Sequence, residues 1–266
     1  MLKIKDVSKG RYWQVVVELV SGCTPCSPGC DHCWSAALAH RFYREGEPCH
    51  ESGLFTDASG RFNGDIVVHP ERLKRLNTGK PKVFSLWNDV FHISVPFDFI
   101  DEFHKINMDN LHNTILLLTK RPERMGLYYQ GRTHWGDEPN IYKGLTICNQ
   151  HEADKKIPIF LQVPGKKFLS IEPILTEINL PLNDEFPDSD GCYEDMRHRI
   201  NAVILGCETG TGARPMDNEW AISIVQKCKS AGVPVFVKQI SINGKPSKNI
   251  DEWPEELRMR ELPWGR

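Results

Sequence analysis

Four cysteines lie within eleven residues near the start of the chain, at Cys23, Cys26, Cys30 and Cys33. Thiolates are the ligands that soft metals and iron–sulfur clusters prefer in proteins. The loop that carries them, Cys-Thr-Pro-Cys-Ser-Pro-Gly-Cys-Asp-His-Cys, contains two prolines and a glycine, so its backbone can curl and turn several sulfurs toward one point. We therefore expect a metal or cluster site directly after the apolar stretch that precedes this loop.

The spacing of the cysteines favours an iron–sulfur cluster over other metals. Cys26, Cys30 and Cys33 form C-x3-C-x2-C, whereas Cys23, Cys30 and Cys33 form C-x6-C-x2-C. Either triad leaves one iron of a [4Fe–4S] cluster without a protein ligand. Structural zinc is usually held by two short ligand pairs roughly 12 to 20 residues apart, and no second cysteine pair follows at that distance. Zinc held by all four thiols, and thiols that are unligated or linked in disulfides, remain the alternatives.

Composition places few other limits on the chain. Its 266 residues are 40% hydrophobic, which is enough for one domain with a large core, and we expect a single domain over residues 1–266. The net charge of −2 gives no global basic field for nucleic acid, so such a substrate would need a local patch. The nine cysteines are clustered, and the sequence shows no signal peptide or long apolar span. These features predict a reducing cytoplasmic location away from membranes.

Short apolar runs alternate with helix-like or polar stretches along the whole chain, which predicts an α/β protein built from βα units. We expect a (β/α) barrel, TIM-like and either complete or partial, with an open doubly wound sheet as the alternative. The eight predicted strands are 14–20, 65–69, 82–87, 114–119, 142–147, 167–171, 202–205 and 234–237. Predicted helices span 35–44, 71–76, 97–107 and 218–231, the last stopped by Gly232. Residues 180–199 read as an inserted loop and residues 250–266 as a C-terminal strap.

Polar residues gather where the predicted strands end. In a βα barrel these positions share the carboxyl-terminal rim, where active sites lie because the barrel interior is packed. The cysteine loop follows the first strand and belongs to the same rim. The other rim residues are His69, Asn88, Asp89, Thr119, Lys120, Arg121, Thr146, Ser170, Glu172, Glu208, Lys238 and Gln239.

Several ordered blocks make the chain resemble an uncharacterised phage and bacterial domain-of-unknown-function family, whose members are called three-Cys-motif proteins. The blocks cover nearly the whole chain and are Gly22-Cys23, Ser27-Pro28-Gly29-Cys30, Cys33-Trp34, Asn88-Asp89-Val90-Phe91-His92, Leu118 to Arg124, Phe168 to Pro173, Gly206 to Gly210, Ala213-Arg214-Pro215 and Phe236 to Gln239. The resemblance implies a fold similar to radical S-adenosylmethionine enzymes, with a [4Fe–4S] cluster on three cysteines.

The resemblance also implies a chemistry. The open iron would bind S-adenosyl-L-methionine, and one electron would cleave its sulfonium to a 5′-deoxyadenosyl radical that abstracts hydrogen from a substrate. The family alignment favours Cys23 as the third ligand, whereas the general spacing of radical enzymes favours Cys26. Under the second alignment His32 takes the place of the aromatic residue near adenine, and Trp34 could stack on adenine.

Roles for the rim residues follow from their charge. Lys120 or Arg121 could neutralise the methionyl carboxylate. Glu172 and Glu208 could accept hydrogen bonds from cofactor or substrate, unless each is held in an ion pair by Lys120, Arg214 or Lys238. Asp89, paired with His92, could move protons. Ser170, Gly206 and Lys238 complete the expected cofactor site.

The expected partners are an electron donor and a substrate, for which family association suggests a nucleotide, a modified base or a nucleic acid. The alternative function is a non-catalytic iron–sulfur or zinc protein that acts with a companion protein. An adapter has little use for polar residues at nearly every strand end, so the sequence favours an enzyme. Among other candidates, the pair Cys49-His50 could add metal ligands, while Cys148, Cys207 and Cys228 read as buried thiols.

Overall fold

The computed structural model describes residues 7–42, 55–187 and 193–264. Its centre is a sheet of eight strands, of which the first seven are parallel and follow each other in sequence order. The strands are β1 (Val15–Glu18), β4 (Val83–Trp87), β5 (Thr114–Thr119), β6 (Ile141–Ile147), β7 (Lys166–Ile171), β10 (Ala202–Gly206), β11 (Val235–Ile242) and the antiparallel edge strand β12 (Lys245–Ser247).

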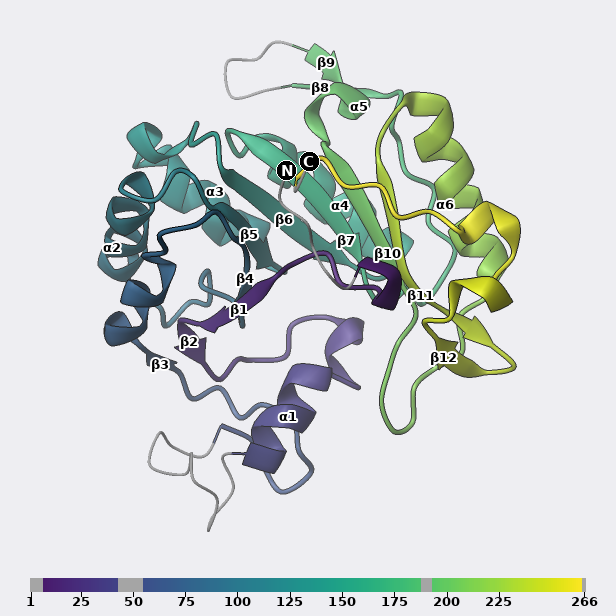
Figure 1. The fold of residues 1–266 in the computed structure, drawn as a ribbon, viewed down its shortest axis with the longest axis horizontal. Helices are drawn as coiled ribbons and strands as arrows, with labels where there is room; N and C mark the ends of the chain where they lie inside the picture. The colour runs from purple at the N-terminus through teal and green to yellow at the C-terminus, as the bar shows by residue number, and fades with distance from the viewer. Residues whose placement is uncertain (1–6, 43–54, 188–192, 265–266) are drawn as a thin grey trace.

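Helices lie along the outside of this curved sheet (Figure 1). They are α2 (Phe97–Met108), α3 (Pro122–Gln130), α4 (Gln150–Leu161) and α6 (Asn218–Ala231). A sheet that always winds in one direction keeps its crossover helices on one face, because these connections are right-handed. A doubly wound sheet would reverse its strand order, so the observed order selects the barrel-like winding predicted from sequence.

Of the two forms predicted, complete or partial, the structure does not show a complete barrel. The predicted strand 65–69 contributes only β3 (Val67–Val68), which pairs antiparallel with β2 (Val20–Ser21) outside the main sheet. Strand β3 cannot extend past Pro70, which begins the 3-10 helix η4 (Pro70–Leu76). This 3-10 helix takes the place of the α-helix predicted over residues 71–76. Within the described residues there is thus no eighth parallel strand to join β11 to β1, and the sheet stays open.

The predicted inserted loop and the predicted C-terminal strap both contain regular secondary structure. Residues 180–199 contain the short antiparallel pair β8 (Glu185–Pro187) and β9 (Tyr193–Asp195), followed by α5 (Met196–Arg199). The C-terminal segment contains the 3-10 helices η6 (Ile250–Glu252) and η7 (Glu255–Leu257) and then pairs with β11 through an isolated bridge from Arg260 to Phe236. The tail therefore covers part of the open edge of the sheet.

The helix that begins at residue 218 confirms its predicted bounds. The Asp217 side chain caps its first turn by accepting a hydrogen bond from the backbone N–H of Glu219. Gly232 ends it in the left-handed conformation with φ 70°, which glycine adopts without steric cost. The first helix, α1 (Trp34–Phe42), begins directly after the last of the four clustered cysteines.

The concave face of the sheet is filled at its amino-terminal end by an aromatic cluster. Tyr142, Phe168 and Phe236 contribute from β6, β7 and β11, and Tyr12 and Trp264 join them from the two ends of the chain. The Trp264 indole N–H donates to the Tyr12 carbonyl at 2.9 Å, and its ring lies 4.9 Å from that of Tyr142. The cavity described below lies beyond this cluster, toward the carboxyl-terminal ends of the strands.

On the opposite face of β6, Lys143 is buried at 1% exposure. Its Nζ donates to the carbonyls of Gly136 at 2.6 Å and Pro164 at 2.7 Å and lies 4.1 Å from the centre of the Tyr129 ring. Burial lowers the pKa of this ammonium from its ordinary 10.5 to about 8. The charged form is thus less stable in the folded protein than in the unfolded chain.

Lys143 should therefore make stability rise with alkaline pH. The penalty for its burial is fully present below pH 8 and is relieved between about pH 8 and 10.5, where the unfolded chain binds the proton and the folded protein does not. The free energy of unfolding of the wild type, relative to Lys143→Met, should increase by about 2 to 3 kcal/mol between about pH 7 and 10. Urea unfolding of both proteins across this range tests this, and a constant difference would show that burial does not lower the pKa of Lys143 in the folded protein.

The described residues include no helix long and apolar enough to cross a membrane.

Candidate functional site

A cavity of about 190 Å³ lies on the concave face of the sheet, above the aromatic cluster. It is lined by most of the residues predicted for the site: Cys23, Cys26, Cys30, Cys33, Trp34, Asp89, Lys120, Arg121, Ser170, Glu172 and Lys238. They come from the cysteine loop, from the start of α1, from the carboxyl-terminal ends of β4, β5 and β7, and from the middle of β11. His32, Gly206 and Glu208 do not line it. Four aromatic residues also line the cavity: Tyr12, Trp13, Trp34 and Trp87.

Within the cysteine loop, residues Pro28–Cys30 form a short 3-10 helix capped by Ser27. Cys26 is exposed and the other three thiols are half-buried. A hydrogen bond between Cys26 and Cys30 raises the pKa of Cys26 and holds the pKa of Cys30 near 5. Of the two thiols, Cys30 thus loses its proton more readily, and the thiolate is the form that binds metal.

Lys120 places a positive charge near these sulfurs. It follows β5 and its side chain enters the cavity. Burial disfavours its charge, but attraction to the cysteines, Cys30 most and then Cys33, leaves the pKa of Lys120 above its ordinary value. One ammonium is thus placed among all four thiols, where it offsets the repulsion between thiolates.

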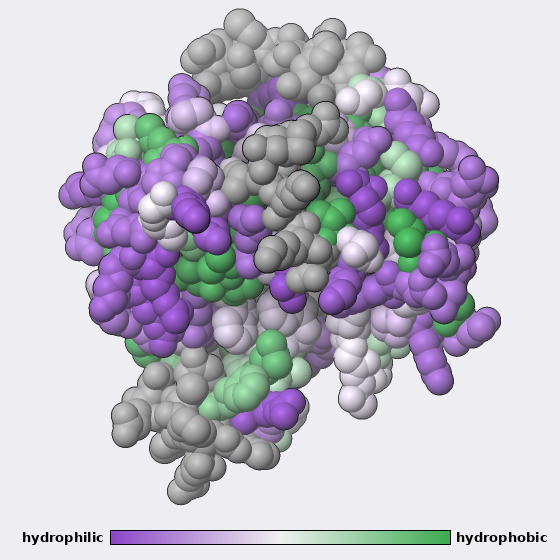
Figure 2. Space-filling view, viewed as in Figure 1, coloured by the Kyte–Doolittle hydropathy of each residue, from purple (hydrophilic) through white to green (hydrophobic). Residues whose placement is uncertain are grey.

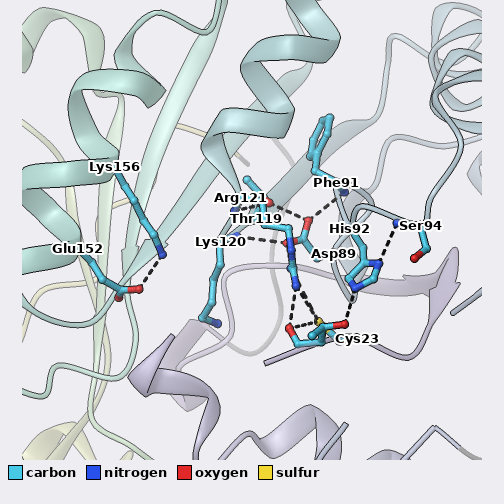
Figure 3. A network of polar contacts seen from close by, with 11 residues as sticks. Cys23, Asp89, Phe91, His92, Ser94, Thr119, Lys120, Arg121, Glu152 and Lys156 are labelled. Atoms are coloured by element: carbon cyan, nitrogen blue, oxygen red, sulfur yellow. Dashed lines mark hydrogen bonds and ion pairs between the residues drawn. The ribbon is translucent and has the colours of Figure 1, made fainter. Parts of the chain in front are cut away.

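Arg121 and Asp89 hold the first half of the cysteine loop (Figure 3). The Arg121 guanidinium donates to Asp89 Oδ2 at 2.7 Å and to the Thr24 carbonyl at 2.7 Å, and it lies 3.9 Å from the Cys23 sulfur. Asp89 Oδ1 accepts from the Thr119 hydroxyl at 2.7 Å. Because protein groups occupy this guanidinium, Arg121 is less suited than Lys120 to bind a methionyl carboxylate.

The predicted pair of Asp89 and His92 does not form. His92 Nε2 instead shares a hydrogen bond of 2.8 Å with the Thr24 hydroxyl, on the same half of the cysteine loop. Burial and then the charge of Arg121 lower the pKa of His92, so its imidazole is neutral at pH 7. Both residues therefore position the loop.

The second half of the loop is held by Glu208 and Arg214, which follow β10. Arg214 donates through Nε to Glu208 Oε2 at 2.9 Å and through Nη2 to the Pro28 carbonyl at 2.9 Å. Burial opposes ionisation of Glu208, but the hydrogen bonds from Arg214 keep its pKa below the ordinary value. Glu208 thus lies outside the cavity lining and forms the ion pair with Arg214 that the sequence offered as the alternative to a ligand contact. His32 lies nearby, against Gly212.

Sequence reasoning missed a third contact to the loop. Cys148 is buried as predicted, but its sulfur lies 3.6 Å from the Ser27 hydroxyl and donates to Glu152 Oε2 at 2.9 Å. Lys156 in turn donates to Glu152 Oε1 at 2.6 Å (Figure 3). The position of Cys148 at the end of β6 was the available signal, because the ends of neighbouring parallel strands meet at one edge.

A second ion pair lies inside the cavity. Lys238 Nζ donates to Glu172 Oε2 at 2.7 Å, and the Ser170 and Tyr12 hydroxyls lie 3.5 Å from Glu172 Oε1. Gly206 flanks the pair, since a Cβ at this residue would lie 3.2 Å from Glu172 Oε2. Glu172 and Lys238 therefore form a charged pair in the wall of the cavity that the cysteines also line.

The donor set suits a soft metal in chemical type, because four thiols and a balancing ammonium share one cavity. The sulfurs are not yet arranged around a common point. No three Cys, His, Asp or Glu side chains of the described residues could hold one ion as they stand. Binding would require the loop to close around the metal, as metal binding coupled to local folding does. Cys49 and His50, the other suggested ligands, lie outside the described residues.

The fold and cavity define a class: an α/β protein with an open, barrel-like parallel sheet and a thiol-lined cavity at its carboxyl-terminal edge. A family model described as "Protein of unknown function (DUF5131)" matches residues 8–253, and the chain belongs to this family. This confirms the predicted membership of an uncharacterised family. No curated protein and no solved structure matches the chain, and the resemblance to radical S-adenosylmethionine enzymes stays a prediction.

Proposed function

We propose that this protein is an iron–sulfur enzyme that cleaves S-adenosylmethionine reductively and abstracts hydrogen from a substrate. The observation that carries the proposal is the convergence of four cysteines and Lys120 on one cavity at the carboxyl-terminal ends of parallel strands. A [4Fe–4S] cluster held there would supply, when reduced, the electron that splits the sulfonium into methionine and a 5′-deoxyadenosyl radical.

Cys30 and Cys33 are two of the proposed ligands, and the contacts favour Cys26 as the third. Cys26 already lies against Cys30 and is exposed, so it can turn without loss of packing. Cys23 contacts the Arg121 guanidinium and its thiol donates to the Thr24 carbonyl at 3.6 Å. The family alignment favours Cys23 instead, and the two assignments predict different variants.

The chain's own residues would bind and orient the ligands. Lys120 would hold the methionyl carboxylate, because its ammonium faces the sulfurs and is not bound to another carboxylate among the described residues. Glu172 and Lys238 would make hydrogen bonds to ribose or substrate from the cavity wall. The aromatic residues Tyr12, Trp13 and Trp87 would exclude water from the reacting atoms.

Anaerobic reconstitution with iron and sulfide should yield about four irons per chain and a paramagnetic signal on reduction. Addition of S-adenosylmethionine and dithionite should then release 5′-deoxyadenosine, measured by liquid chromatography. A cluster without this product would favour the non-catalytic iron–sulfur protein, and selective uptake of one zinc would favour the zinc protein. Either result would contradict the proposed enzyme.

A further inference from the structure

Two tryptophans form a stacked pair at the mouth of the cavity. The rings of Trp34 and Trp87 lie 6.1 Å apart at an interplanar angle of 11°. Trp34 is 53% exposed, although both rings line the cavity. It starts α1, over which Figure 2 shows hydrophobic residues at the surface beside polar ones. A large aromatic residue with this exposure offers a free ring face to a ligand.

Hydrogen bonds fix the inner ring of the pair. The Trp87 indole N–H donates to the Ser35 hydroxyl at 2.6 Å, which donates to Asn88 Oδ1 at 2.8 Å. The Asn88 amide donates in turn to the Val20 carbonyl at 2.8 Å. Asn88 has φ 64°, a conformation that is uncommon outside glycine and costs energy. The Trp87 ring, on which Trp34 stacks, is therefore held in place before any ligand arrives.

Cationic residues lie on the other side of Trp87. This ring also lines a second hollow of about 510 Å³, together with Phe42, Glu18, Glu71, Arg72, Lys74 and Arg75. Glu18 accepts from Arg72 at 2.6 Å, and Glu71 lies 3.5 Å from the same guanidinium. The two acids are thus engaged by Arg72, whereas the side chains of Lys74 and Arg75 are exposed and form no ion pair within the described residues.

We propose that this surface binds a nucleotide, with its base stacked on Trp34 and its phosphate contacted by Lys74 and Arg75. Every nucleobase has a flat face that stacks on exposed aromatic rings, and neighbouring cations attract the phosphate. Trp87 lines both hollows, so the aromatic and cationic parts adjoin, and the base would lie at the mouth of the cysteine cavity. A free nucleotide and a single strand of nucleic acid share this chemistry. As an assignment of substrate class, the inference rests on the proposed function.

Binding can be measured on the iron-free protein without S-adenosylmethionine, so failure of the cluster chemistry would not affect the result. Calorimetry with AMP, GMP, CMP, UMP and the matching nucleosides, and anisotropy with a labelled oligothymidylate, cover both sources. Trp34→Ala should weaken binding about tenfold or more, and Trp34→Phe should restore most of it. The double variant Lys74→Ala/Arg75→Ala should weaken nucleotide binding toward the level of the nucleoside and reduce its dependence on salt.

The matched controls lie on helices away from this surface. Trp220→Ala removes a partly buried indole of α6, and Lys155→Ala/Lys229→Ala removes two exposed cations of α4 and α6. Neither should change nucleotide affinity. Binding of monophosphates would identify a free nucleotide, and binding of the oligonucleotide alone would identify a strand. The proposal is overturned if neither probe binds at millimolar concentration, or if Trp34→Ala binds as tightly as the wild type.

Discussion

Replacement of Cys30 with alanine is expected to abolish iron binding, from about four irons per reconstituted chain to near zero. Cys30 belongs to both possible ligand triads, and the hydrogen bond with Cys26 keeps its pKa near 5, so it is the thiol best prepared to bind first. Cys33→Ala should have the same effect because it too belongs to both triads. Iron and sulfide analysis, together with the spectrum of the reduced protein, measures the loss.

The remaining two cysteines give opposite expectations under the two ligand assignments. If Cys26 is the third ligand, Cys26→Ala should lose the reduced-cluster signal while Cys23→Ala keeps it. The family alignment predicts the reverse. Cys228→Ala is the matched control, because Cys228 is buried in α6 and burial raises its pKa to about 12. Full iron uptake by Cys30→Ala would show that Cys30 is not a ligand and would contradict both ligand assignments.

The sequence was sufficient to locate the cavity because parallel strands place their ends at one edge. Polar residues at the ends of the predicted strands 114–119, 167–171 and 234–237 were expected to converge, and Lys120, Glu172 and Lys238 do line one cavity, although β11 continues beyond Lys238. This step needs only the identification of strands, which hydrophobic patterning provides. It does not need the pairing of individual side chains.

Pairing was harder to predict because it depends on contacts distant in sequence. Glu208 was expected either to face a ligand or to form an ion pair, and the structure pairs it with Arg214, which also donates to the Pro28 carbonyl of the cysteine loop. Nothing in a local pattern indicates that a loop from residue 28 meets one from residue 214. The stacking of Trp34 on Trp87 likewise joins two residues that are far apart in sequence, so no local pattern predicts it.

The sequence did not reveal that the sheet stays open, because this depends on how one short segment pairs. The run at residues 65–69 has the composition of a strand but only two residues of it pair, and Pro70 removes a backbone donor where the extension would continue. Its partner is the short β2, not a neighbour in the parallel sheet. Strand composition alone cannot tell these two pairings apart.

Removal of the Asp89 carboxylate should cause the largest loss of stability among the site variants. Asp89 and Arg121 are mostly buried, at 10% and 16% side-chain exposure, and Asp89 also accepts from Thr119 and from the backbone N–H of Phe91. Asp89→Ala would leave the Arg121 charge buried without its partner. Breaking such a pair costs about 3 to 5 kcal/mol, which we expect as the decrease in free energy of unfolding.

Asp98→Ala provides the matched control, because Asp98 is 97% exposed and lies 3.9 Å from its arginine partner, Arg132. An exposed pair of this kind contributes at most about 1 kcal/mol. Urea unfolding of the iron-free proteins measures both variants without a contribution from metal. A loss below about 1 kcal/mol for Asp89→Ala would mean that Arg121 finds water or another acceptor. The expected loss would mean that the ion pair fixes the first half of the cysteine loop before any metal binds, because the same guanidinium holds the Thr24 carbonyl.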